Sequence, residues 1–331
     1  MPETRAPLLL TMGDACGIGP EILVKAIRQD DGADLCVVGD VDVMRRATQG
    51  ALPLVQVDSP MEDAPPRCLS VWQPDDLPKG LIDLPMGQID ARAGLAAARC
   101  IAAAVRAVQA GRGRAIVTAP IHKEAFHAAG VAHPGHTEML QELAAQGGVQ
   151  RPVRMMLANP ELRVVLVTIH CSLRQAIEQV HFDAVLQTLR IADAALKRFG
   201  IDRPRLAVAG LNPHAGEGGL FGSEEIDHIA PAIKAARGDD IDARGPFAPD
   251  TVFMRARKGE FDAVIAMTHD QGLIPVKYLG VEQGVNVTLG LPFVRTSPDH
   301  GTAFDIAGQG RADATSMLAA IRMARLLAQA P

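Results

Sequence analysis

The chain has 331 residues, more than the roughly 100 to 200 of a typical single domain, which favours two domains with a cleft between them. Hydrophobic residues make up 48% of the sequence and charged residues 21%, so a folded core is expected and disorder is not. The formal net charge of −5 argues against a broad nucleic-acid-binding surface, which needs clustered lysines and arginines.

Cysteine usage and hydropathy indicate the compartment. The 5 cysteines are dispersed and include no CxxC pair, which argues against a disulfide framework and against cysteine-ligated zinc. The first residues lack a signal-peptide pattern, and no apolar run approaches the roughly 18 residues that a membrane span requires. We therefore expect a cytoplasmic protein that is not held in a membrane.

Alternating strand-like and helix-like segments predict an α/β fold. Short runs rich in leucine and β-branched residues predict buried strands at residues 8–12, 35–40, 115–120, 163–168, 205–210 and 261–267. Apolar residues spaced three and four apart predict helices at 91–110 and 183–199. Residues 57–90 carry many prolines and little periodicity, which favours an irregular surface segment.

Two local signals refine this outline. Residues 154–168 look like two strands joined by a turn at Asn159-Pro160, which predicts an antiparallel pair and therefore a mixed sheet. After the first strand, Gly19 can act as an N-cap with Pro20 at the first helical position. The glycines there lack the last glycine of GxGxxG, and no GxxxxGK[ST] occurs, so neither nucleotide-binding fingerprint is present.

Three histidines directly follow predicted strands, namely His170, His214 and His269. Ligands of open α/β sheets bind beyond the carboxyl ends of strands, so these side chains could meet in one crevice. Three neutral imidazoles suit a divalent metal such as zinc and leave coordination positions open for a substrate. A single histidine after a strand is more often a surface or hydrogen-bonded residue, and these wide spacings form no local ligand signature.

Other residues near these histidines carry weaker signals. Asp270 follows His269 and could orient its imidazole or approach the metal, although a solvent-facing loop aspartate is equally ordinary. Ser172 and Gln175 match a capping box that would start a helix just after His170. Cys171 lies beside a candidate ligand, but a thiol there is as easily a small buried filler, so we assign it no role.

Anion-binding candidates occur in two places. In GHTE, His136 and Thr137 come at a predicted helix start, where an imidazole, a hydroxyl and free backbone donors can hold a phosphate or carboxylate. Plain N-capping by Thr137 is equally compatible with the sequence. Lys277, Asn286 and Arg295 are donors within an otherwise apolar segment, which suits an anionic ligand but also surface charges on hairpin strands.

Taken together, the motifs resemble those of the PdxA family, the 4-hydroxythreonine-4-phosphate dehydrogenases of vitamin B6 biosynthesis. The resemblance runs from about Leu10 to about Ala324 and rests on TMGDACGIGPE, TAPIHKEAF, GHTEML, MMLANPELRVVLVT, GLNPHAGEGGLFGSEE, AMTHDQGLIPVKY and GVNVTLGLPFVRTSPDHGTAFDIAG. It implies two α/β/α domains with mixed sheets, similar to isocitrate and isopropylmalate dehydrogenases, with the active-site cleft between them. We expect residues 1–125 and 290–331 to form the first domain and residues 126–289 the second, with most metal and substrate residues in the second.

The resemblance also implies a homodimer with its active site at the subunit interface, where His170 and His214 face His269 of the partner subunit across a divalent metal. Zinc is the first candidate metal, and magnesium and cobalt would also suit. The substrate, a small phosphorylated hydroxy acid, would be held by His136, Thr137, Lys277, Asn286 and Arg295. Lys277 could also transfer a proton, but we favour binding.

The implied reaction is the oxidation and decarboxylation of 4-hydroxythreonine 4-phosphate to 3-amino-2-oxopropyl phosphate, with NAD or NADP as the hydride acceptor.

The first motif departs from the family wording at Ala15-Cys16, and the segment around His170 departs from it at residues 169–172. Relatives acting on D-threonate or D-erythronate 4-phosphate, which yield dihydroxyacetone phosphate and carbon dioxide, also vary there. The histidine set alone would also permit a metal-dependent lyase without redox chemistry, and the anion contacts alone would permit a non-catalytic phosphometabolite-binding protein.

Overall fold

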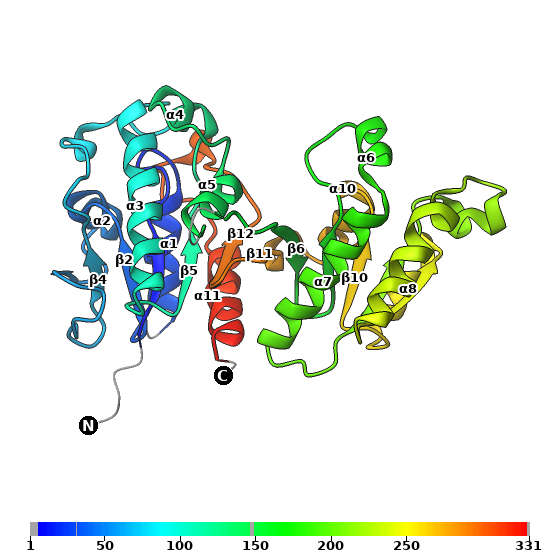
Figure 1. Ribbon diagram of the computed structural model, residues 1–331. Helices are drawn as coiled ribbons and strands as arrows, with labels where there is room; N and C mark the ends of the chain where they lie inside the picture. The colour runs from blue at the N-terminus through cyan, green and yellow to red at the C-terminus, as the bar shows by residue number, and fades with distance from the viewer. Residues whose placement is uncertain (1–5, 31, 146–148, 330–331) are drawn as a thin grey trace. The chain divides into compact units, whose positions relative to one another are not determined.

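The computed structural model describes residues 6–30, 32–145 and 149–329. The chain divides into two compact units, which are described separately (Figure 1). Unit 1 comprises Met1–Arg151 and Leu291–Ala328, and unit 2 comprises Pro152–Gly290. Both units consist of a sheet covered by helices, so the α/β class predicted from the alternating segments is confirmed.

The described part of unit 1 contains a sheet in which every neighbouring pair of strands is parallel, in the order β3-β4-β2-β1-β5-β12. Strands β1, β5 and β12 are buried throughout, as expected for strands covered on both faces. The strands are β1 (Leu8–Thr11), β2 (Leu35–Val38), β3 (Leu54–Val57), β4 (Leu69–Trp72), β5 (Ala115–Thr118) and β12 (Val294–Pro298).

Helices cover this sheet along its central strands. Helix α3 packs on β1, β2 and β5, whereas α11 packs on β1, β5 and β12. The hydroxyl of Thr296 in β12 donates to the Ala320 carbonyl of α11, so the preceding side chain, Arg295, points to the opposite face. The helices of unit 1 are α1 (Gly19–Gln29), α2 (Val41–Thr48), α3 (Ala91–Gln109), α4 (Lys123–Ala128), α5 (His136–Leu143) and α11 (Thr315–Leu327).

The sheet of unit 2 is mixed, as the hairpin signal predicted. Its order is β11-β6-β7-β10-β8-β9, and β6 runs antiparallel to both of its neighbours. Asn159 makes the turn between β6 and β7, where its Oδ1 accepts hydrogen bonds from the backbone of Glu161 and Leu162. The strands are β6 (Arg154–Ala158), β7 (Arg163–Leu166), β8 (Arg205–Ala209), β9 (Asp242–Phe247), β10 (Ala263–Ala266) and β11 (Val285–Leu289).

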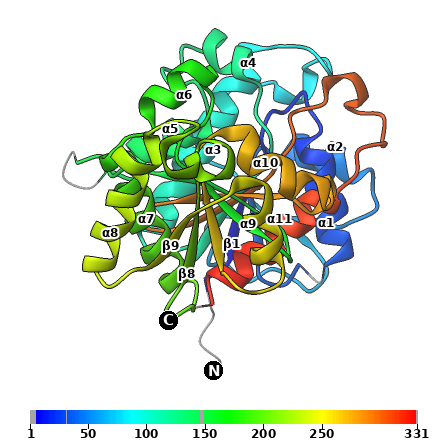
Figure 2. The same cartoon turned by 90° about the vertical axis from the view of Figure 1, so that its right-hand side faces the viewer.

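The helices of unit 2 flank the parallel strands. Figure 2 shows α7 and α8 on one side of β8 and β9, with α9 and α10 on the other. On the side of α9 and α10, Val252, Leu273 and Val276 pack with Leu157 and Val264 of the sheet in one buried cluster. The helices are α6 (Leu173–Gln179), α7 (Phe182–Arg198), α8 (Ala230–Gly238), α9 (Pro249–Arg257) and α10 (His269–Tyr278), with the short turns η2 (Pro213–Gly219) and η3 (Glu225–Ile229).

Two features of unit 1 differ from the expectation. The proline-rich segment 57–90 is not irregular throughout, because Leu69–Trp72 forms strand β4 between β2 and β3. The division between the units falls after Arg151 rather than after residue 125. The reason is packing, since α4 and α5 both contact α3 and the ring of Phe126 in α4 is fully buried. None of the described helices is long and apolar enough to span a membrane.

Candidate functional site

The three candidate metal histidines follow three neighbouring parallel strands of unit 2. Strand β10 pairs with β7 on one side and with β8 on the other. His170 follows β7, His269 begins α10 directly after β10, and His214 lies in η2 after β8. The tertiary structure therefore places all three at the carboxyl edge of the sheet, where ligands of α/β proteins bind.

His170 and His269 are the pair that this edge brings together. Their ring centres are 5.7 Å apart, and the rings are inclined by 44°. Both line a hollow of about 450 Å³ formed by the segment after β7 and the start of α10, together with Cys171, Leu173 and Asp270. The capping box predicted at Ser172 is present and starts α6 beside this hollow.

Asp270 holds the His269 ring in one orientation. The Asp270 carboxylate lies 2.7 Å from the Nδ1 of His269. An ionised carboxylate can only accept, so this contact places the ring proton on Nδ1 and leaves the Nε2 lone pair available to a metal. Such an arrangement is typical of histidines that bind metals, and it favours the orienting role for Asp270 over that of a plain loop aspartate.

His214 is not gathered with the other two histidines in this chain. It is exposed, and its ring packs 6.1 Å from that of Phe221. Among the described residues, no three His, Cys, Asp or Glu side chains are grouped closely enough to hold a metal ion. The described part of the chain therefore contains a close pair, His170 and His269, and a third histidine that follows the neighbouring strand.

The geometry of the close pair fits a shared metal ion. Two imidazoles that bind one zinc ion at tetrahedral angles have ring centres roughly 5 to 6 Å apart, because each Zn–N bond is about 2 Å long. The separation of 5.7 Å lies within that range. Neutral nitrogen ligands also suit several other divalent metals, so the pair does not select zinc.

The loop that carries His214 is held from inside by a buried carboxylate that sequence reasoning missed. Glu225, 3% exposed, accepts hydrogen bonds from the backbone N–H groups of Leu211 and Asn212 at 2.7 and 2.8 Å. Residues 214–219 all have positive φ values, and a Cβ on Gly216 would lie 2.7 Å from the Glu225 carboxylate. The glycines of LNPHAGEGG are thus required by backbone conformation and by close approach.

Gln271, which was also missed, ties the ends of two strands together. Its Oε1 accepts from the backbone of Met267 at 2.7 Å, and its Nε2 donates to the Gly210 carbonyl at 2.8 Å. Met267 follows β10 and Gly210 follows β8. The segments leading to His269 and His214 are therefore linked by one amide, a relationship that no pattern along the chain encodes.

Unit 1 contains a second candidate site, a hollow of about 200 Å³ at the carboxyl edge of its sheet. His136 lines it at the start of α5, together with Lys123 after β5, Ser297 near the end of β12 and His300 after that strand. The Nε2 of His136 is buried and has no hydrogen-bond partner among the described residues. Burial, and secondly repulsion from the Arg295 guanidinium, lower the pKa of His136 well below its usual value of 6.5.

Thr137 does not cap α5, because Gly135 is the N-cap residue and no side chain caps the helix. The capping interpretation of Thr137 is therefore wrong. Helix α5 starts at His136, as predicted, with first-turn N–H groups that an anion can use. His136 and Thr137 both belong to unit 1, not to the second unit.

Arg295 is 3% exposed within β12, and burial lowers its pKa to about 10. It therefore carries a positive charge at neutral pH in an environment of low polarity, where a charged hydrogen bond is strong. Its Nη2 donates to the hydroxyl of Thr118 at 2.6 Å. Arg295 is thus not a surface charge interrupting a hairpin strand, but a buried cation beside His136.

Lys277 and Asn286 lie on one side of the sheet of unit 2. Lys277 is half-buried in the last turn of α10. Asn286 of β11 is half-buried and pairs with Leu157 of β6, which packs against α10. Cross-strand partners point to the same face, so Asn286 shares that face with α10.

A third buried group, Asp14, was not predicted. It follows β1 and is 1% exposed, and its Oδ1 accepts from the Cys16 backbone at 2.9 Å. Its Oδ2 is buried without a hydrogen-bond partner among the described residues. Burial raises the pKa of Asp14 to about 6, and burial likewise raises the pKa of the neighbouring Cys16 thiol to about 12. The sequence did contain a signal that could have identified this residue, because Asp14 is an aspartate that follows the first predicted buried strand.

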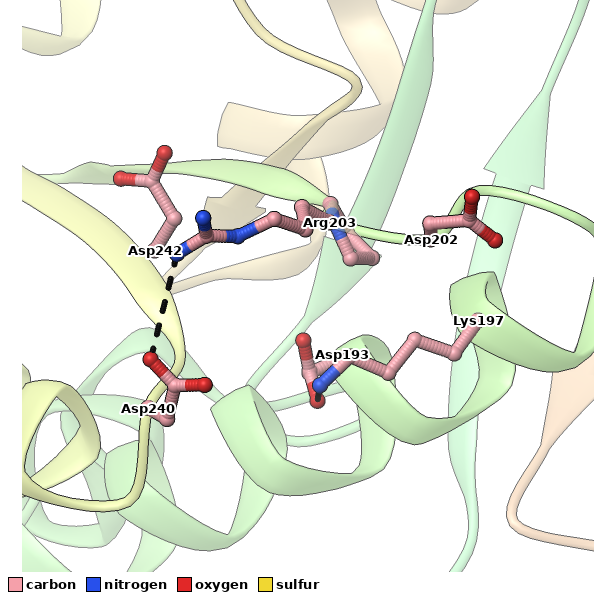
Figure 3. A pocket seen from close by; sticks show the side chains of 7 residues that line it. Asp193, Lys197, Asp202, Arg203, Asp240 and Asp242 are labelled. Carbon is pink, nitrogen blue, oxygen red and sulfur yellow. Dashed lines mark ion pairs between the residues drawn. The ribbon is translucent and has the colours of Figure 1, made fainter.

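A different hollow, of about 350 Å³, lies at the opposite edge of unit 2 (Figure 3). Its lining includes Asp202 and Arg203, which precede β8, and Asp242, which begins β9. Its cations are matched by carboxylates, as in the ion pair of Lys197 with Asp193 at 2.9 Å. Because the amino edge of parallel strands rarely binds ligands, this hollow is a weak candidate.

Comparisons with known proteins agree with the resemblance of the motifs. A family model described as pyridoxal phosphate biosynthetic protein PdxA matches residues 31–324. A 4-hydroxythreonine-4-phosphate dehydrogenase of Beijerinckia indica is 53% identical, over 94% of this chain and 92% of the relative. A D-threonate 4-phosphate dehydrogenase of Pectobacterium atrosepticum is 45% identical, over 97% and 99%. The crystal structure of a 4-hydroxythreonine-4-phosphate dehydrogenase from Klebsiella pneumoniae superposes with a TM-score of 0.91 at 44% identity, covering 99% of this chain and 100% of that one.

Proposed function

Because the chain belongs to the PdxA family of pyridoxal phosphate biosynthetic proteins, we propose that it oxidises and decarboxylates 4-hydroxythreonine 4-phosphate to 3-amino-2-oxopropyl phosphate in the cytoplasm. The relatives named above are dehydrogenases, and this supports a nicotinamide cofactor as the hydride acceptor. The observation that carries the proposal is the His170–His269 pair, with Asp270 orienting one ring, at the carboxyl edge of a parallel sheet.

The metal-binding part of the proposal assigns His170, His214 and His269 as ligands of a divalent ion. A divalent ion held by these histidines would polarise the substrate alcohol and lower its pKa, which would favour hydride transfer to NAD or NADP. Asp270 keeps the His269 Nε2 free for binding. Zinc is the first candidate, followed by magnesium and cobalt.

The substrate-binding part assigns the anionic groups of the phosphorylated acid to Arg295, His136, Thr137, Lys277 and Asn286. The buried Arg295 supplies a fixed cation with two donor directions. His136 stays neutral at pH 7 because its pKa is lowered, so it offers a hydrogen bond without an additional charge. Lys277 contributes a cation from the last turn of α10, which suits a carboxylate or phosphate.

We further propose that the metal site is completed in a homodimer. The motif resemblance puts His170 and His214 opposite His269 of the partner subunit, but within this chain the close pair is His170 and His269, and among the described residues His214 is not grouped with them. The proposed dimer therefore brings His214 of the partner subunit to the His170–His269 pair. Exposed apolar side chains near the candidate ligands support association of two copies. Leu173, 70% exposed, lines the hollow that contains His170, and Phe221, 47% exposed, packs against His214. A sedimentation experiment over a range of concentrations tests this point, and a monomer with full activity would exclude it.

The second candidate substrate is D-threonate 4-phosphate. It is favoured by the name of the Pectobacterium relative, which is 45% identical to this chain. D-erythronate 4-phosphate is a closely related compound and is considered with it. Of the two departures from the family wording, residues 169–172 line the hollow that contains His170 and His269, so they could affect such a choice. The purified enzyme should be assayed for reduced cofactor with each of the three acids, with NAD and NADP, and with zinc, magnesium or cobalt. Turnover of none of them would reject the dehydrogenase proposal, and turnover without a nicotinamide would indicate a lyase.

A further inference from the structure

A neighbouring hydroxyl contacts the Arg295 guanidinium inside the sheet of unit 1. Arg295 belongs to strand β12, and its Nη2 donates to the Oγ1 of Thr118, the last residue of β5, at 2.6 Å. Both side chains are buried, at 3% and 1% exposure. A hydrogen bond between a cation and a hydroxyl in such a place is strong and restricts rotation of the guanidinium.

The strand register explains why Thr118 can reach Arg295. Arg295 pairs with Ile116 of β5, and Ile116 and Thr118 are two residues apart. Side chains two apart on a strand, and side chains of cross-strand partners, point to the same face of a sheet. Thr118 therefore lies one pleat from Arg295 on the same face, and it lines the same hollow as His136.

The neighbouring strand provides an internal comparison. Thr11 of β1 pairs with Thr118 and is also fully buried on this face. Its hydroxyl has no hydrogen-bond partner among the described residues. The two threonines thus share residue type, burial and strand position, and they differ in whether the hydroxyl contacts Arg295.

We propose that Thr118 is a positioning residue for substrate binding: its hydroxyl holds the Arg295 guanidinium in place beside the hollow that Thr118 and His136 line, where Arg295 attracts the substrate anion. This inference rests on the proposed role of Arg295. Threonine fits the position because its hydroxyl accepts the bond, whereas valine has the same shape and no acceptor. Thr118 itself takes no part in the chemical step.

The test compares Thr118→Val, Thr118→Ser and the matched control Thr11→Val in steady-state kinetics with 4-hydroxythreonine 4-phosphate, or with whichever of the three acids the enzyme turns over. We expect Thr118→Val to raise KM by roughly 10-fold or more while kcat changes by less than about threefold, because a charged hydrogen bond that orients a binding group is lost. The inhibition constant of inorganic phosphate should weaken in parallel. Thr118→Ser should restore both values, and Thr11→Val should leave both unchanged.

Three outcomes overturn the inference. The first is Thr118→Val with an unchanged KM, and the second is equal impairment of Thr118→Val and Thr118→Ser. The third is an equal rise of KM in Thr11→Val, which would indicate general damage to the sheet. If Thr118→Val does not fold, Thr118→Ala against Thr118→Ser gives the same comparison.

A parallel variant, Arg295→Gln, separates this inference from the proposed function. If Arg295→Gln leaves KM unchanged, Arg295 does not bind substrate, and both the site assignment and the role of Thr118 fail. If Arg295→Gln raises KM and Thr118→Val does not, the site assignment stands and only the positioning role is rejected. If both proposals hold, the double variant Thr118→Val with Arg295→Gln raises KM no further than Arg295→Gln alone, because the two residues act through one contact.

Discussion

The carboxylate of Glu225 holds Asn212 by both its backbone and its side chain, accepting from the Asn212 backbone N–H at 2.8 Å and from its Nδ2 at 2.9 Å. With the bond from Leu211, three donors depend on this one buried group. The loop that presents His214 is therefore built around a carboxylate rather than around packed apolar side chains. Residues 214–219 all have left-handed backbone conformations, which are strained for residues other than glycine. The loop therefore depends on the hydrogen bonds to Glu225 to keep this conformation.

Replacing Glu225 with alanine should destabilise the protein by about 2 to 4 kcal/mol, because three part-buried donors of Leu211 and Asn212 lose their acceptor. Urea unfolding measures the loss, and limited proteolysis should cut within residues 210–222. Glu225→Gln, which keeps one acceptor oxygen, should lose less. The matched control is Glu224→Gln, at a half-buried position with one bond to Asn212, where we expect a change below about 1 kcal/mol. Equal effects at both positions would contradict the anchoring role.

Asp14 should make stability depend on pH in the direction opposite to that of an ion-paired aspartate. Burial raises its pKa from 3.8 to about 6, so folding favours the protonated form. Stability associated with this group is therefore fully present below about pH 4 and is lost as the pH rises through 6. Asp14→Asn should be more stable than the parent at pH 8 by up to about 3 kcal/mol, with little difference at pH 4. Denaturant midpoints of both proteins at the two pH values decide this, and a constant difference would refute it.

His136 should remain neutral across the physiological range. Burial and the Arg295 charge lower its pKa well below 6.5, so the unfolded chain binds a proton that the folded protein does not. Its contribution to stability is therefore present above about pH 6.5 and is lost as the pH falls below that value. In NMR titrations the His136 ring resonance should not shift between pH 6 and 8. A midpoint near 6.5 for His136 would show that its site is solvated.

The histidine pair should control metal content. His170→Ala and His269→Ala should each purify with little divalent metal, whereas the control His127→Ala, at an exposed position in unit 1, should match the parent. Asp270→Asn should weaken metal affinity by about 10- to 100-fold, because the bond that orients His269 is weakened. Elemental analysis and chelator competition provide these values independently of activity. Unchanged metal content in both histidine variants would remove them from the ligand set.

Local elements of this fold could be predicted from the sequence because each has a short-range cause. The capping box at Ser172, the turn at Asn159 and the start of α5 at His136 depend on a few neighbouring residues. Strand β4 was not predicted because four residues between prolines give too little alternation to outweigh the turn signals around them. The resemblance to a known family supplied the substrate residues, which no periodicity could identify.

The sequence by itself determined where strands end and that a histidine follows three of them, since hydrophobic runs and chain order are local properties. Only the tertiary structure decided that β7, β10 and β8 are neighbours, that His170 and His269 face one hollow, and that His214 lies apart from them. Strand order and side-chain contacts depend on long-range packing. The raised pKa of Asp14 and the lowered pKa of His136 depend on desolvation, which exists only once the core has closed around them.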